Sequence, residues 1–143
     1  MKLPFPFEEM KAKSLRGIAV RPPKDLEEIL ENAQCVEDIP EDKLSQWAYW
    51  WAQFIGDKEL MRPLVTDPQY AFLWARKLGD HDIMRPLITQ SKWAYMWAKD
   101  IGDHDIMRPL ITESEWAYMW GRFIGDRDIM RPLLKGTEYE DKI

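Results

Sequence analysis

The sequence lacks most features that secreted, membrane-spanning and metal-binding proteins need. Its only cysteine is Cys35, which excludes an internal disulfide and any site built from several thiolates. No run of roughly 20 apolar residues occurs, so no membrane span is expected. The opening residues, MKLPFPFEEM, contain prolines and acids where a signal peptide needs an unbroken apolar stretch. A reducing compartment, the cytoplasm, is therefore the expected location.

A block of basic residues is also missing. The chain has 20 Lys and Arg against 25 Asp and Glu, a net charge of −5, and the two signs are interspersed. Nucleic-acid binding through a simple basic face is therefore disfavoured.

Catalytic motifs are absent as well. There is no Gly-rich phosphate loop, no Ser nucleophile motif and no His at catalytic spacing from Cys35. The sequence predicts a protein that is not an enzyme, with no catalytic residue and no cofactor.

What the sequence does contain is a 23-residue internal repeat. The tetrapeptide Met-Arg-Pro-Leu begins at positions 61, 84, 107 and 130. The four copies span residues 47–69, 70–92, 93–115 and 116–138. Residues 1–46 precede them as an arm and capping helix, and residues 139–143 begin a truncated fifth copy.

The first half of each copy predicts an amphipathic helix. In copy three, a buried stripe with helical spacing consists of Ala94, Trp97, Ala98 and Ile101. Gly102 follows in the place of a left-handed residue that ends a helix. Asp103 comes next and is expected to cap a second helix through its side chain. The equivalent pairs are Gly56-Asp57, Gly79-Asp80 and Gly125-Asp126.

The second half predicts a short helix interrupted by proline. Its expected buried stripe in copy three is Ile106, Met107, Leu110 and Ile111. Pro109 removes a helical hydrogen bond, which favours a kink or a 3₁₀ turn. The next first helix should then start near Thr112, which has capping-box spacing to Glu115, or in copy one near Thr66, with Pro68 at an early helical position.

These features predict an all-α fold, a short α-solenoid of four 23-residue two-helix repeats with an N-terminal capping segment. Neighbouring copies must stack, because one pair of short helices cannot bury its apolar stripe alone. In the capping segment, Asp25 is expected to cap a helix with Glu28 at capping-box spacing. The apolar stripe of that helix, Leu26, Ile29, Leu30 and Ala33, should dock on copy one. Before it, residues 1–23 are expected to form an arm along the solenoid, with an extended segment at residues 17–23.

Two aromatic ladders run through the copies. One consists of Trp47, Tyr70, Trp93 and Trp116, and the other of Tyr49, Phe72, Tyr95 and Tyr118. Packing between repeats is the expected role of the Trp ladder. The tyrosines lie off the core stripe, so they are the better candidates for an exposed recognition face.

An arginine ladder follows an acid by three residues in every copy. Its members are Arg62, Arg85, Arg108 and Arg131, and the acids are Glu59, Asp82, Asp105 and Asp128. Salt bridges on the surface or between repeats are the favoured interpretation, and a bidentate contact to a partner's carboxylate or phosphate is the alternative. The candidate partner-binding residues are therefore Tyr49, Tyr95, Tyr118, Arg62, Arg85, Arg108 and Arg131.

His81 and His104 hold one position in successive copies. Copies one and four have Lys58 and Arg127 there, which is typical of a solvent-facing position that tolerates any polar group. No metal site is predicted.

The string RPLVTDPQYAFLWAR, Arg62 to Arg76, resembles the short tandem helical repeats of bacteriophage and giant-virus proteins. Those repeats also pair a proline-centred turn with an aromatic-rich helix, but they share no common activity whose residues could be carried over. The resemblance implies a phage origin, and with it an inhibitor of host machinery or of a host defence system.

Three functions follow. The favoured hypothesis is a non-catalytic module that binds a protein partner, in its specific form a phage-encoded inhibitor of a host or defence protein. The alternative is a structural protein that stacks end to end as a homo-oligomer through an exposed C-terminal repeat. The lesser alternative is nucleic-acid binding or mimicry by the aromatic and arginine ladders.

Overall fold

The structure, a computed structural model, describes residues 7–16 and 21–143. Every regular element in these residues is helical, as the sequence predicts. The chain forms two compact units, Met1–Tyr70 and Ala71–Ile143, which are described separately. Within the described residues, no helix is long and apolar enough to cross a membrane.

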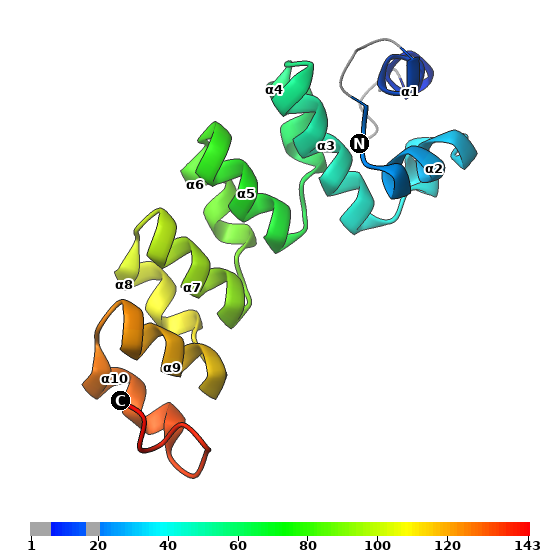
Figure 1. Cartoon of the computed structure of the whole chain (residues 1–143). Coiled ribbons are helices and arrows are strands. Elements are labelled where there is room, and N and C mark those ends of the chain that lie inside the picture. Colours follow the sequence, from blue (N-terminus) through cyan, green and yellow to red (C-terminus); the bar gives the residue numbers. More distant parts are fainter. Residues whose placement is uncertain (1–6, 17–20) are drawn as a thin grey trace. The chain divides into compact units, whose positions relative to one another are not determined.

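Unit 1 contains the capping segment and the first repeat. Its elements are α1 (Phe7–Arg16), α2 (Lys24–Asn32), η1 (Val36–Asp38), α3 (Glu41–Phe54), α4 (Lys58–Met61) and η2 (Arg62–Leu64) (Figure 1). Both α4 and η2 pack on α3, so the first repeat is a helix pair.

The first part of the capping segment is a helix. Phe7, at the start of α1, packs edge-on against Trp47, with ring centroids 5.8 Å apart. The indole Nε1 of Trp47 donates to Ser14 Oγ at 2.9 Å, and all three side chains are buried. Residues 21–23 have no regular structure, and the rest of the expected extended arm, residues 17–20, lies outside the described residues.

The helix α2 differs from its prediction at one end. It begins at Lys24 and no side chain caps it, so the capping-box role of Asp25 is wrong. Asp25 lies in the first turn and pairs with Lys43 of α3 instead. The apolar stripe of α2 is buried as expected at Leu26, Leu30 and Ala33, whereas Ile29 is only half-buried, and α2 packs on α3.

Unit 2 continues the 23-residue pattern. Its elements are α5 (Pro68–Leu78, which spans the division), α6 (His81–Met84), η3 (Arg85–Leu87), α7 (Ser91–Asp100), α8 (His104–Met107), η4 (Arg108–Leu110), α9 (Ser114–Phe123) and α10 (Arg127–Leu134). The first helices α7 and α9 pack on each other, and α10 packs on α9. Helix pairs therefore stack in sequence, which confirms the α-solenoid prediction.

The core repeats with the chain. Trp74, Trp97 and Trp120 are fully buried on the first helices, and Met84, Met107 and Met130 are fully buried on the second. The expected stripe of the second helix is only partly right. Ile111 is buried, but Leu110 is only half-buried and Ile106 is half exposed, because neighbouring residues of a helix point in different directions and Met107 is the one that enters the core.

The Gly-Asp corner has the expected position and a different mechanism. Gly102 has a φ of 130° and Asp103 a φ of 59°, so both residues adopt the left-handed half of the backbone map. Asp103 stands at the N-cap of α8, but its side chain makes no capping hydrogen bond, and the capping prediction is wrong there. A capping side chain normally extends from a β-region backbone. From its left-handed backbone, Asp103 bonds to Trp97 instead.

Proline shapes the second helices as predicted in three copies. Each four-residue helix passes into a 3₁₀ turn, namely η2, η3 and η4. In the fourth copy α10 continues as one α-helix with Pro132 inside it.

The next first helix starts at Pro68 in copy two, as expected, but at Ser114 and not at Thr112 in copy four. The predicted Thr112 cap is therefore wrong. The buried hydroxyl of Ser91, one repeat earlier, accepts from the backbone N–H of Thr112 at 2.9 Å and of Glu113 at 3.2 Å. In unit 1, Ser45 makes the same pair of contacts to Thr66 and Asp67.

Residues after α10 fold back onto α9. Tyr139 stacks on Tyr118 with centroids 4.9 Å apart and an interplanar angle of 19°. Ile143 lies against Gly121 of α9: a Cβ atom added to Gly121 would be only 2.8 Å from Ile143 Cδ1. The predicted end-to-end stacking assumed an exposed apolar end at this place, and these side chains cover part of it; self-assembly itself stays a prediction.

Candidate binding surface

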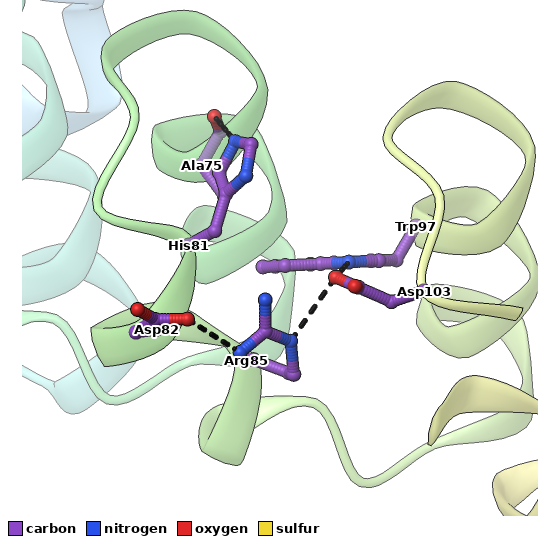
Figure 2. Close-up of polar contacts among 6 residues, drawn as sticks. All are labelled: Ala75, His81, Asp82, Arg85, Trp97 and Asp103. Atoms are coloured by element: carbon purple, nitrogen blue, oxygen red, sulfur yellow. Dashed lines mark hydrogen bonds and ion pairs between the residues drawn. The ribbon is translucent and has the colours of Figure 1, made fainter. Parts of the chain in front are cut away.

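A polar network joins successive repeats of unit 2 (Figure 2). One carboxylate oxygen of Asp103 accepts from Trp97 Nε1 at 2.9 Å and from Arg85 Nε at 3.0 Å. Arg85 also donates from Nη1 to Asp82 at 2.8 Å. Figure 2 shows Arg85 and Trp97 approaching Asp103 from different repeats. The network thus ties repeat two to repeat three.

The next pair of repeats has the same network. Asp126 accepts from Trp120 Nε1 and from Arg108 Nε, both at 3.0 Å, and Arg108 also binds Asp105. The hydrogen bond from Trp120, followed by that from Arg108, lowers the pKa of Asp126 below its usual range. The bonds from Trp97 and then Arg85 lower the pKa of Asp103 in the same way. These carboxylates are structural acceptors, held charged at neutral pH.

This network decides the role of two predicted arginines. Arg85 and Arg108 form both the salt bridge within the repeat and the one between repeats, which confirms the favoured interpretation of the ladder. Arg131 differs, because among the described residues its one ion pair is with Asp128, and its side chain is 53% exposed against 22% for Arg85. Arg62, in unit 1, is half-buried. Partner binding by these arginines stays a prediction.

The two aromatic ladders interleave. In unit 2 the ring centroids of Tyr95 and Trp116 lie 5.7 Å apart. The equivalent distances are 5.8 Å for Phe72–Trp93 and, in unit 1, 6.2 Å for Tyr49–Tyr70. Each third-position ring therefore packs on the first-position ring of the next copy.

This packing corrects the expectation for the tyrosines. Tyr95 is only 2% exposed, so its placement on an exposed face is wrong. Its ring is needed to fill the space beside Trp116, which the periodicity of a single helix does not reveal. Tyr49 and Tyr118 are half-buried, and their binding to a partner stays a prediction. Binding of nucleic acid by the ladders stays a prediction as well.

The histidine position fastens the second helix to the first. The Nε2–H of His81 donates to Ala75 O and that of His104 to Ala98 O, both at 3.0 Å. Arg127 Nε makes the equivalent bond to Gly121 O at 3.3 Å. These side chains are exposed as expected. Across the described part of the chain, no group of three or more His, Cys, Asp or Glu is arranged to hold a metal ion.

Sequence reasoning missed a repeated set of exposed apolar residues in unit 2, whose other exposed large apolar side chain is Phe123 of α9, at 58%. Ile83 and Ile106 are each 50% exposed and Ile129 is 53% exposed, all at one position of the repeat. Three residues after each isoleucine stands an exposed proline, Pro86, Pro109 or Pro132. We call these six residues the Ile-Pro stripe. The repeated isoleucine was visible in the sequence, but its direction depends on which neighbour enters the core.

Charged residues and hollows border the Ile-Pro stripe. Asp82, Asp105 and Asp128 precede the isoleucines, and their side chains are 94%, 95% and 93% exposed. An open hollow of about 480 Å³ at repeat two is lined by residues including His81, Asp82 and Ile83. A second hollow of 350 Å³ at repeat four is lined by residues including Asp128 and Pro132. The Ile-Pro stripe is thus bordered by an exposed carboxylate at each of the three repeats and by an open hollow at repeats two and four.

Comparison with known proteins identifies no relative. No protein-family model matches the chain, and neither a curated protein nor a solved structure matches it. The functional argument therefore rests on the surface itself.

Proposed function

We propose that the protein is a non-catalytic protein-binding module that recognises its partner through the Ile-Pro stripe. The observation that carries the proposal is the half-exposure of Ile83, Ile106 and Ile129 at equivalent positions. Singly exposed apolar side chains are ordinary, but a contiguous apolar patch with a polar rim marks an interaction site.

The arrangement of unit 2 supports this choice of surface. The second helices α6, α8 and α10 follow one another along one side of the unit, so equivalent side chains form a row (Figure 1). The ring pairs Phe72–Trp93 and Tyr95–Trp116 and the arginines of repeats two and three are engaged in contacts between repeats. Packing between repeats does not explain why an apolar side chain stands at the half-exposed isoleucine position.

A phage-encoded inhibitor of a host or defence protein is the specific form of this proposal, and it rests on the sequence resemblance alone. An inhibitor needs only a rigid surface complementary to its target, which stacked repeats provide. The exposed, free Cys35 fits a reducing compartment such as the cytoplasm.

The test is affinity purification of the tagged full chain from its source organism, followed by mass spectrometry. Three baits are compared: the wild type, a stripe variant carrying Ile83→Ser, Ile106→Ser and Ile129→Ser, and a control variant. The control carries Arg76→Ser, Lys99→Ser and Arg122→Ser, which are exposed equivalent positions on the first helices.

We expect one protein to be retained by the wild type and the control and lost with the stripe variant. Retention by the stripe variant would move the binding surface elsewhere. If the folded wild type retains no protein, the binding function itself is refuted.

A further inference from the structure

The stripe also carries information about the shape and charge of what it binds. We infer that its ligand is an extended protein segment, in a polyproline-II-like conformation, with an apolar side chain at every third residue and basic residues between them. This inference rests on the proposed function and adds the chemistry of the partner.

The distance between successive repeats fits such a segment. The first helices α7 and α9 pack on each other, and packed helices lie about 8–10 Å apart, so equivalent side chains of successive repeats are expected at about that spacing. A polyproline-II segment has three residues per turn and rises about 3.1 Å per residue, which places every third side chain on one face about 9.3 Å apart. Such a segment places one apolar side chain on each repeat without bending.

The Ile-Pro stripe is narrow. Each repeat contributes one isoleucine and one proline to it, for example Ile106 and Pro109, and the flanking Asp105 side chain is 95% exposed. An amphipathic helix needs a groove with apolar walls on both sides. A narrow stripe bordered by carboxylates suits an extended segment, whose side chains can alternate between apolar and charged contacts.

Negative charge exceeds positive charge beside the stripe in repeats two and three, because each arginine there pairs with two carboxylates. Arg85 contacts Asp82 and Asp103. Arg108 contacts Asp105 and Asp126. One negative charge for each arginine is therefore left over beside the isoleucine. Lys or Arg of the ligand would complement it.

The charge changes at repeat four, which orients the ligand. Among the described residues, Arg131 forms its ion pair with Asp128, and Arg127 stands where repeats two and three have histidine. Lys135 lies in the same hollow as Arg131, and Asp128 and Glu140 also line it, so the surplus negative charge of repeats two and three is missing at repeat four. The segment should therefore have its basic residues over repeats two and three, and an acidic residue or terminal carboxylate over repeat four.

The experiment is selection of a displayed library of random 16-residue peptides on the full chain, with counter-selection on the stripe variant. We expect enriched peptides to have aliphatic residues three apart, Lys or Arg between them and an acid at one end. A variant with Asp82→Asn and Asp105→Asn should weaken an enriched synthetic peptide several-fold at low salt, roughly two- to fivefold for each carboxylate. Arg131→Gln should weaken only peptides that carry the terminal acid.

Four outcomes would overturn the inference. Enriched peptides with apolar residues at helical spacing would indicate a helix as ligand, and acidic peptides would reverse the charge argument. Loss of self-association in the stripe variant would identify a second copy as the occupant. If no peptide is enriched, the extended-ligand inference fails, yet the proposed function stands if affinity purification still shows a partner lost with the stripe variant.

Discussion

Replacing Asp103 with alanine tests the network that joins the repeats. The substitution removes the acceptor for Trp97 Nε1 and for Arg85 Nε. Asp57 supplies a matched control in the first repeat, with the same left-handed backbone at a φ of 55°. Within the described residues the Asp57 carboxylate has no hydrogen bond or ion pair, and the indole Nε1 of Trp51 has no partner.

The expected effect follows from these contacts. Trp97 is fully buried, so its N–H without an acceptor costs about 1–3 kcal/mol. The ion pair with Arg85 is partly exposed and contributes about 0.2–1 kcal/mol more. Alanine in a left-handed conformation adds about 1–2 kcal/mol, but this strain is common to both positions and cancels in the comparison. Asp103→Ala should therefore destabilise the protein by about 1–4 kcal/mol more than Asp57→Ala.

Urea unfolding followed by circular dichroism measures both variants against the wild type. Adding Trp97→Phe to Asp103→Ala should recover part of the loss, because phenylalanine brings no buried donor. A difference between Asp103→Ala and Asp57→Ala of less than about 0.5 kcal/mol would refute the claim that the network stabilises the stack.

Three further predictions concern other contacts. Ser91→Ala should lower the free energy of unfolding by about 1–2 kcal/mol, because two backbone N–H groups lose their acceptor. Ser114→Ala is the control and should change the free energy little, because the Ser114 hydroxyl has no described hydrogen bond. Equal effects of the two substitutions in urea titrations would contradict this prediction. The pKa values of Asp103 and Asp126 are lowered, so the stability that these carboxylates contribute is present above about pH 4 and is lost as the pH falls through the lowered values. The free energy of unfolding should therefore decline on acidification. The decline should be less steep in the double variant Asp103→Asn/Asp126→Asn than in the wild type. Gly121→Ala should stabilise α9 by up to about 1 kcal/mol through helix propensity, but the new methyl group would displace Ile143. The substitution should therefore raise the midpoint temperature of unfolding more in a protein that already carries Ile143→Ala than in the wild type.

Particular residues show where sequence reasoning succeeded. The 23-residue period, the glycine corner and Pro109 act within one or two turns of chain, so the helix pairs and the 3₁₀ turns of three copies were predictable. Pro132 is the exception, since α10 continues through it. The side chains of Asp103 and Ile106 were misassigned because their partners or their exposure come from a neighbouring helix.

The sequence by itself determined the repeat, the all-α class and the residues that could form a ladder, because these depend on local periodicity and backbone preference. Only the tertiary structure decided which ladder is buried and which is exposed. Stacking buries Tyr95 against Trp116, engages Arg85 and Arg108 between repeats and leaves Ile83, Ile106 and Ile129 half exposed. The physical reason is that burial is a property of the interface between repeats, and every copy repeats the same local pattern whether its side chains meet a neighbour or water.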